Sequence, residues 1–355
     1  MQRLLLAIIL LPALMLPLFG GDEEKVELAE PLAKFSKRLG DWDGAGTVQM
    51  QPGMPKMDWT SHGTLSVVLD GKFILNEMKL DFGGMIPRIF YRTYYGYDAS
   101  RDELVCYSVG NTGLMSVSDR AYWADDETLV VVELAEQDGV EMISRAITTI
   151  KDGVHRYRWE SATGAQPFEL MIEGTMQRSE TSFQISAEDW ANSFMQVPAP
   201  APMQKLARMA GQYVMEGDYH MFPGQPPIPV ASNETIKAVF GGHVLMFHSD
   251  GIPNPATDNF EYEAFAYMVW DPTRGKFRQF WLNNMGECSA HEHGMVGENL
   301  LVSTMARWQL DTPEAVRGTL ELDENGVPVR VWMDRLLSTD QPKRAFSGTY
   351  KKKSE

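Results

Sequence analysis

The sequence repeats itself at an offset of 171 to 174 residues, and this repeat constrains the fold more than any other feature. Residues 39–42 recur as residues 210–213, and residues 67–75 recur as residues 238–246. Shorter matches join Asn111-x-Gly113 to Asn284-x-Gly286 and Gly174-Thr175-Met176 to Gly348-Thr349-Tyr350. The offset drifts slowly in one direction, as a few small insertions would produce. Two copies of one domain are therefore predicted.

The segments between and before the copies set the predicted domain boundaries. Residues 196–203 are rich in proline and alanine, which is typical of a semi-rigid linker, so the domains are predicted at 31–195 and 204–355. Residues 22–30 form an acidic tether. Residues 1–21 carry one arginine, an apolar run and two glycines, which indicates a signal peptide and export to the periplasm or medium. An uncleaved N-terminal anchor is the alternative, and no other stretch is long and apolar enough to span a membrane.

Each copy has the pattern of an antiparallel β-domain. Segments such as 129–134 and 143–150 are rich in β-branched residues. Hairpin turns are predicted at Asp70-Gly71, Asp138-Gly139, Asp152-Gly153 and Asn325-Gly326. Apolar residues at helical spacing predict a short helix at 31–39 and another at 204–209. The predicted fold is all-β: two tandem up-and-down barrels of about eight to ten strands, each opened by a short helix, since closure removes exposed strand edges.

The order of these motifs resembles a known family. A helix runs into Gly40-x-Trp42, a Gly-(Lys/His)-(Phe/Val) strand and a Gly-Tyr-Asp corner follow, and a Gly-Thr strand closes each copy. This pattern resembles a bacterial family of unknown function with a calycin-like barrel, similar to lipocalins and fatty-acid-binding proteins, here duplicated. The second copy departs from it with Tyr213 in place of the tryptophan. The resemblance implies a barrel able to hold a small ligand and brings no catalytic residue with it.

Composition and missing motifs exclude several functions. The 355 residues include 32 basic and 48 acidic side chains, a net charge of −16, which argues against a nucleic-acid partner. The sequence has no Gly-x-Ser-x-Gly elbow, no phosphate-binding Walker loop and no His-Glu-x-x-His helix. We therefore lean towards a non-enzymatic protein, with no catalytic residue and no cofactor implied. Cys106 and Cys288 either join the two domains in a disulfide or remain two separate thiols.

The sharpest local feature is a pair of histidines in the second copy. If Cys288-Ser-Ala-His291-Glu-His293 is a strand, His291 and His293 point to the same side. Together they could supply half of a metal site, with a third ligand from His220, His248 or Cys288. The alternative is that the pair faces solvent or is satisfied by neighbours. Haem-binding barrels of the nitrobindin type place a histidine near the end of the domain, whereas the last histidine here is His293, which counts against haem.

Aromatic residues and arginines complete the candidate ligand site. Trp281 and other tryptophans on strand-like segments, with 22 methionines, suit an apolar cavity and equally a solid core. Arg278 could hold a ligand carboxylate, or could lie on the surface. The candidate ligand residues are His220, His248, Arg278, Trp281, His291 and His293.

Three functions follow from these residues. The leading one is an exported, non-enzymatic binder of a small apolar or amphipathic molecule. The alternatives are a metal- or haem-dependent enzyme in the second barrel, and a structural or interaction protein with two filled barrels.

Overall fold

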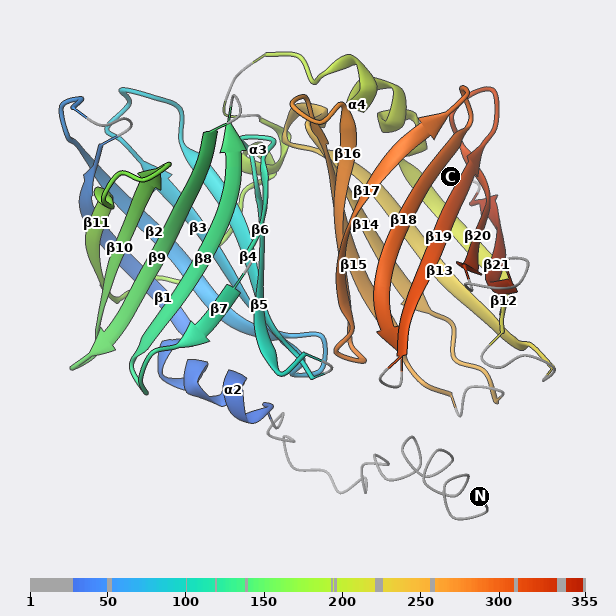
Figure 1. Ribbon diagram of the computed structural model, residues 1–355, viewed down its shortest axis with the longest axis horizontal. Helices are drawn as coiled ribbons and strands as arrows, with labels where there is room; N and C mark the ends of the chain where they lie inside the picture. The colour runs from blue at the N-terminus through green and yellow to red at the C-terminus, as the bar shows by residue number, and fades with distance from the viewer. Residues whose placement is uncertain are drawn as a thin grey trace.

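Two closed antiparallel β-barrels stand side by side in the chain (Figure 1). The computed structural model describes residues 28–49, 53–99, 101–118, 120–137, 140–192, 194, 197–220, 226–255, 259–309, 312–336 and 343–353. The expected signal peptide lies outside the described residues, as does most of the acidic tether. The all-β, two-barrel prediction is confirmed. Within the described ranges, no helix has the length and apolar character needed to cross a membrane.

The first barrel is a ring of ten strands in which each strand pairs with its neighbour in the chain and the last pairs with the first. A short additional strand, β6 (Met115–Val117), pairs with β5 beside the ring. The ring strands are β1 (Gly40–Val48), β2 (Met57–Val68), β3 (Phe73–Asp81), β4 (Ile89–Asp98), β5 (Glu103–Gly110), β7 (Arg120–Trp123), β8 (Thr128–Gln137), β9 (Val140–Lys151), β10 (Val154–Thr163) and β11 (Glu169–Arg178).

The second barrel repeats this ring with the same up-and-down order. Its first strand, β12, pairs with its last, β21, which closes the barrel. The strands are β12 (Gly211–Tyr219), β13 (Ile228–Val239), β14 (Val244–Gly251), β15 (Glu263–Asp271), β16 (Lys276–Asn283), β17 (Cys288–Val296), β18 (Leu300–Gln309), β19 (Thr312–Leu322), β20 (Pro328–Leu336) and β21 (Lys343–Lys352).

A short helix opens each barrel, as the sequence predicts. The first comprises α2 (Glu30–Ala33) and η1 (Lys34–Arg38), and the second comprises α4 (Ala201–Leu206) and η2 (Ala207–Met209). Each runs into a buried aromatic side chain that bonds back to the helix: Trp42 Nε1 donates to the Arg38 carbonyl at 2.7 Å, and Tyr213 OH donates to the Met209 carbonyl at 2.8 Å. Tyr213 therefore takes the role of the tryptophan. The last three residues predicted as linker already belong to α4, where Met203 is fully buried.

Three of the four predicted hairpin turns are present, at Asp70-Gly71, Asp152-Gly153 and Asn325-Gly326. Asp152 and Gly153 form a two-residue turn and both have positive φ, which Asp-Gly pairs in such hairpins adopt readily. Asp70 and Gly71 also have positive φ, in the four-residue connection 69–72. Asp138-Gly139 lies outside the described residues. These tight turns connect neighbouring strands directly and so favour the up-and-down order.

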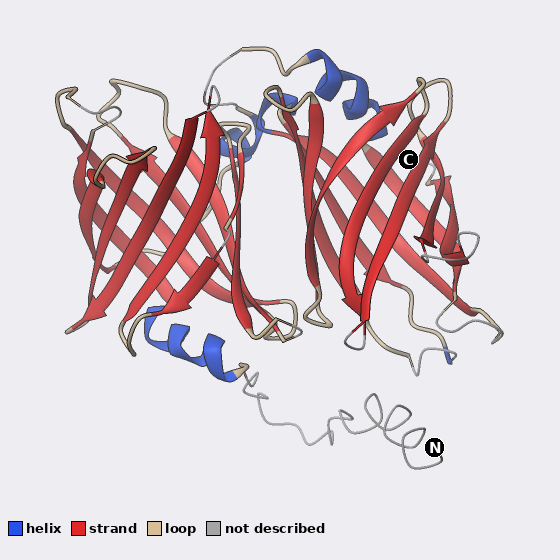
Figure 2. Cartoon of the chain, in the orientation of Figure 1, coloured by secondary structure: helices blue, strands red, loops and turns tan. Residues whose placement is uncertain are grey.

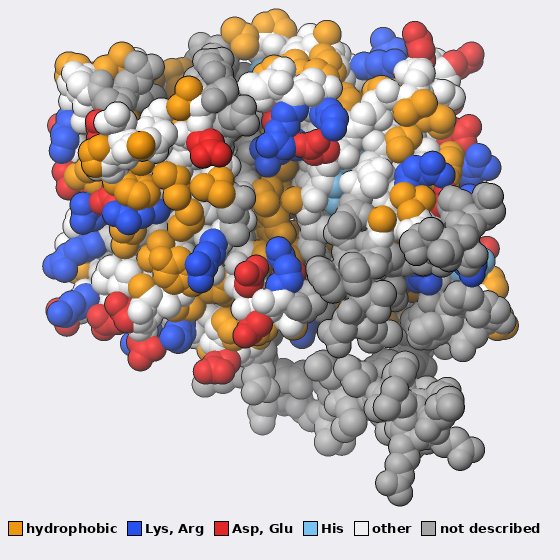
Figure 3. All heavy atoms as spheres, in the orientation of Figure 1, with side chains coloured by type: hydrophobic (Ala, Val, Ile, Leu, Met, Phe, Trp, Pro, Cys, Tyr) orange, Lys and Arg blue, Asp and Glu red, His pale blue; other side chains and the backbone are white. Residues whose placement is uncertain are grey.

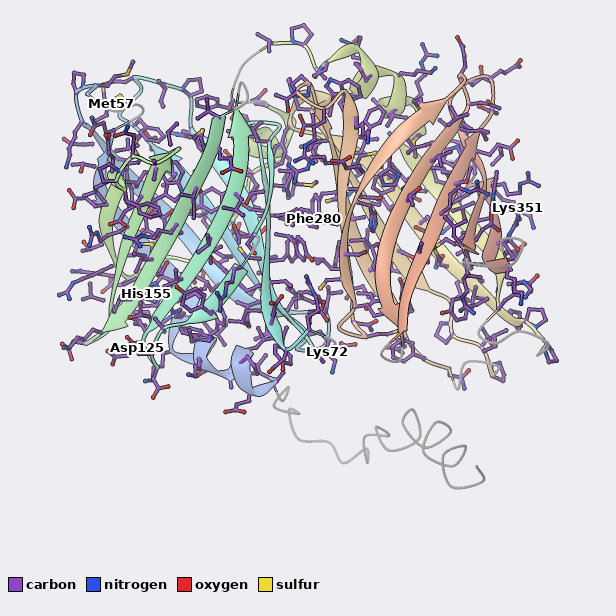
Figure 4. All side chains as sticks on the ribbon, viewed as in Figure 1. Met57, Lys72, Asp125, His155, Phe280 and Lys351 are labelled. Carbon is purple, nitrogen blue, oxygen red and sulfur yellow. The ribbon has the colours of Figure 1, made fainter. Side chains whose placement is uncertain are left out.

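The two barrels contact each other through equivalent faces. Tyr94 on β4 and Tyr267 on β15, which occupy the same position in the two copies, hydrogen-bond through their hydroxyls at 2.7 Å. Tyr107 on β5 stacks on its equivalent Phe280 on β16, with ring centroids 5.4 Å apart. Figure 4 shows Phe280 between the barrels. A buried apolar cluster from both copies surrounds these pairs.

The edges of this contact repeat the same symmetry. Gly113 lies against His243 of the second barrel, and the equivalent Gly286 lies against Lys72 of the first. The helices also cap opposite ends of the two barrels (Figure 2). The contact is thus isologous, with the approximate two-fold symmetry of a homodimer.

The visible surface of both barrels mixes acidic and basic side chains (Figure 3). On the described part of that face, no single-sign basic patch is present.

Candidate functional site

Strand β17 presents its histidines and its cysteine to opposite sides. Met295, two residues beyond His293, packs in the interior core of the second barrel, so His291 and His293 face the interior as well. Cys288 packs against the cluster between the barrels, and Glu292 forms surface ion pairs with Arg274 and Lys276. The prediction that both histidines share one face is therefore confirmed, and that face is the interior.

The two histidine side chains are half-buried, and one ring nitrogen of each lacks a hydrogen-bond partner among the described residues. The two rings lie 5.7 Å apart at an interplanar angle of 71°. Nδ1 of His291 and Nε2 of His293 are buried and have no hydrogen-bond partner in the described part of the chain. Burial lowers the pKa of His291 to about 4, and burial together with the neighbouring His291 lowers the pKa of His293 to about 3. Both imidazoles are therefore neutral at pH 7, each with one donor and one acceptor nitrogen.

A carboxyl group lies on the interior face of β13. Glu234 alternates with Ile236 of the interior core and accepts hydrogen bonds from Ser232 Oγ at 2.5 Å and Ser249 Oγ at 2.7 Å. Burial raises the pKa of Glu234 despite these bonds. Its equivalent in the first copy is Gly63, so the second interior has gained a polar group here.

The wall next to the histidines is mixed. Phe277 on β16 lies directly opposite His293 and is fully buried in the interior core, while Ser303 on β18 flanks His293 on the other side. Trp281 lies four residues beyond Phe277 on the same face of β16 and pairs with Ser289. The interior thus places aromatic rings beside hydroxyl and imidazole groups, which suits an amphipathic molecule.

Only part of the predicted site is brought together. Trp281, His291 and His293 face the interior of the second barrel, but Arg278 faces the first barrel and donates to the Met115 carbonyl at 3.5 Å. His248 lies on the outer face of β14, because Leu245 and Phe247 on the same strand pack in the interior core. His220 follows the last residue of β12, where its backbone N–H donates to the Ala345 carbonyl.

The predicted metal set of His291, His293 and Cys288 is not formed. Cys288 is an odd number of residues from both histidines, so a regular strand sends it to the other face. There its thiol lies against Tyr107 of the first barrel, and burial raises its pKa to about 11. Cys106 faces the interior of the first barrel, and both cysteines are free thiols, so the disulfide alternative is not realised.

The interior of the first barrel is built differently. Tyr91, Tyr95 and Tyr157 pack against its interior core, and burial raises the pKa of all three. Tyr91 OH donates to Met78 Sδ at 2.9 Å. Ser118, the equivalent of His291, accepts from the Cys106 backbone N–H at 3.0 Å. The first interior is therefore filled largely by its own aromatic side chains.

Glu234 is an interior polar residue that the sequence alone did not identify as a candidate. It lies in a polar stretch, Ser232 to Thr235, that resembles a solvent-facing strand. The signal that could have found it is the difference between the copies. The equivalent of Glu234 in the first copy is a glycine, Gly63. The copies differ in the same way at His291, whose equivalent in the first copy is Ser118.

Family comparison agrees with this architecture. A model of a family described as "Protein of unknown function (DUF1579)" matches residues 30–180 and again residues 199–315. The chain belongs to the DUF1579 family. The two matches fall on the two barrels, so the chain is a tandem duplication of a DUF1579 domain. No curated protein matches it.

Solved structures similar to this DUF1579 chain are distant. Rv2717c from M. tuberculosis is 12% identical, with a TM-score of 0.31, and covers 43% of this chain and 100% of its own. A protein of unknown function from the DUF3598 family of Nostoc punctiforme is 10% identical, with a TM-score of 0.28, and covers 92% of this chain and 100% of its own. Likeness of this degree carries no argument about a ligand or an activity.

Proposed function

We propose that this DUF1579 protein is exported and holds a small amphipathic molecule inside its second barrel without chemically changing it. The observation that carries the proposal is the pair of buried, unpartnered nitrogens on His291 and His293. Export is supported by the charged and apolar composition of residues 1–21.

Unpaired polar atoms inside a protein are costly. Each buried donor or acceptor without a partner costs about 1–3 kcal/mol, and most native structures avoid them. Two such atoms on neighbouring rings point to a group that completes them when bound. A hydroxyl or amide headgroup can donate to one imidazole nitrogen and accept from another, while Phe277 and Trp281 contact an apolar tail.

The two alternatives have less support in the described residues. A metal-dependent enzyme in the interior needs a third ligand near His291 and His293, and Cys288 lies on the other face. A purely structural protein with two filled barrels leaves the two nitrogens without a role. That second alternative is an outcome of the test below.

The test is a titration of the full chain with dodecan-1-ol, with dodecane as the tail-only probe, followed by native mass spectrometry and intrinsic tryptophan fluorescence. We expect one dodecan-1-ol per chain, bound about tenfold more tightly than dodecane, because one good hydrogen bond contributes about 1.5 kcal/mol. The double variant H291L/H293L should abolish this preference. The matched control H248Q, a histidine on the outer face of the same barrel, should leave it unchanged.

Three results would contradict the proposal. The first is that neither probe binds, which would favour filled barrels. The others are equal binding of both probes and a preference for dodecan-1-ol that persists in H291L/H293L. Protein purified from the periplasmic fraction of a bacterial host tests export in the same experiment, since its mass should lack about the first 21 residues.

A further inference from the structure

The outer face of the second barrel carries a compact cluster of metal-binding side chains, separate from the interior pair. His248 and Asp250 lie two residues apart on β14, and Glu263 lies on β15 directly opposite Asp250. His248 Nε2 is 3.1 Å from Glu263 Oε1 and 3.3 Å from Asp250 Oδ1. One ligand atom from each residue lies within 4.8 Å of the other two.

Neighbouring groups hold this cluster in place. The His248 ring stacks on Phe265, with centroids 4.5 Å apart and planes only 10° from parallel. The Glu263 backbone N–H donates to the buried amide oxygen of Asn284 at 3.1 Å. Ring stacking therefore orients the His248 imidazole, and strand pairing places Asp250 and Glu263 beside it, before any ligand arrives, which reduces the entropy lost on binding.

The equivalent patch on the first barrel is satisfied by its own residues. Glu77, the equivalent of His248, pairs with Arg92 at 2.6 Å. Lys79, the equivalent of Asp250, pairs with Asp189 of α3 (Ala187–Ala191) at 2.8 Å. The next residue of α3, Trp190, lies over the Arg92 guanidinium at 4.3 Å. Charge is therefore balanced on this patch and a helix covers part of it.

The patch on the second barrel lacks that balance. Among the described residues, Asp250 and Glu263 form ion pairs only with His248. A single imidazole N–H can donate one good hydrogen bond, so it cannot satisfy two carboxylates at once. The two carboxylates lie near each other on the surface, and a bound cation would offset their repulsion.

We propose that His248, Asp250 and Glu263 bind a divalent transition-metal ion of the zinc class on the outer surface of the second barrel. Two donors each about 2.1 Å from such an ion lie about 3.0–3.5 Å apart, which matches both separations from His248 Nε2. An imidazole with two carboxylates suits zinc, manganese or iron(II), whereas calcium prefers oxygen ligands alone. Three protein ligands leave a coordination position open for water or for a side chain of another molecule.

The test is calorimetric titration of the chelator-treated full chain with ZnCl2, with Co2+ absorption as a second readout. We expect one ion per chain, and H248Q, D250N and E263Q should each weaken binding by about tenfold or more. The matched control is D43N, which breaks the pair of His62 and Asp43 on the first barrel, a histidine and a carboxylate at 2.7 Å. D43N and H291L/H293L should both bind zinc as the unmodified protein does.

Three results would overturn this proposal: no zinc binding at roughly millimolar concentration, binding that persists unchanged in H248Q, or binding lost in D43N or H291L/H293L. Circular dichroism of each variant establishes that it folds, so a loss of binding can be assigned to the site. The dodecan-1-ol titration is independent of this result, because the cluster lies on the opposite face of the barrel wall.

Discussion

The two barrels come from one repeated sequence, yet the faces through which they contact each other have stayed alike while their interiors have diverged. At the contact between them, Tyr94 meets Tyr267 and Tyr107 meets Phe280, each residue facing its own equivalent. Inside, the first barrel is packed with tyrosines around one buried histidine, His155, and the second holds the pair His291 and His293 with a buried carboxyl. A change on the shared face must fit both copies at once, whereas a change inside one barrel affects only that barrel. Duplication therefore freed the interior to specialise.

The largest expected effect tests the symmetry of the contact. Phe280 is fully buried, so F280A should destabilise the chain by about 3–5 kcal/mol through lost burial and a cavity. Y107A, the equivalent change on the first barrel, should cost a similar amount because the two rings stack on each other. Urea unfolding of the full chain measures both. Y122A, on an exposed tyrosine of the first barrel, is the control and should cost little.

A large difference between F280A and Y107A would break this comparison. It would mean that the two faces do not contribute equally to the contact. An unfolding midpoint unchanged in both variants would show that the barrels are joined only by the covalent chain.

The second prediction compares how much stability each barrel loses in acid. His155 lies in the first barrel, where Figure 4 labels it. Burial lowers the pKa of His155 to about 3, with Arg38 and Arg178 adding to the shift. His291 and His293 are lowered in the same direction in the second barrel. All three are neutral in the folded chain at pH 5 but protonated once unfolded, where the pKa is about 6.5. Stability is therefore lost as pH falls below about 6.5, by about 2 kcal/mol per histidine at pH 5 relative to pH 7.

Hydrogen exchange at pH 7 and pH 5, corrected for the intrinsic rate, measures this loss for each barrel. The second barrel, with two such histidines, should lose about 4 kcal/mol of protection against about 2 kcal/mol for the first. H291L/H293L should remove nearly all of this loss from the second barrel and leave the loss in the first barrel unchanged. Equal losses in the two barrels of the unmodified protein would contradict the assignment.

The smallest expected effect is the change in the free energy of unfolding caused by a single substitution, and its sign is the test. Replacing His291 or His293 with leucine removes an unpartnered buried nitrogen and should raise the free energy of unfolding by about 1 kcal/mol. Y91F in the first barrel removes a hydroxyl that is bonded to Met78 and should lower it slightly. Urea unfolding at pH 7 without added ligand measures both. A destabilised leucine variant would show that the imidazoles have partners in the empty protein.

Much of the fold was predictable because it depends on local patterns. The drifting offset gave two domains, and the Asp-Gly turns at 70–71 and 152–153 gave short hairpins, hence an up-and-down order. The pairing of His291 with His293 on one face followed from the two-residue period of a strand. Whether Arg278 and His248 face the interior or the outside of the barrel was not predictable in this way. The two-residue period shows which residues share a face of a strand, but it does not show which face lies inside the barrel.

The hydrophobic pattern of a strand could not show which of its faces lies inside the barrel. On β16, Phe280 and Leu282 face the other barrel while Phe277 faces the interior, and all three are buried. The contact between the barrels makes the outer face of these strands as apolar as the inner one, so the usual inside–outside signal disappears.

The sequence by itself therefore determined the duplication, the antiparallel strands, the opening helices and the shared face of the histidine pair, since each depends on residues close in the chain. Only the tertiary structure decided that this pair faces the interior with one buried, unpartnered nitrogen on each ring, that Cys288 contacts Tyr107, and that His248 joins Asp250 and Glu263 on the outer surface. Those outcomes depend on how each sheet curves to close and on which faces the two barrels press together. Both are set by packing between residues far apart in the chain.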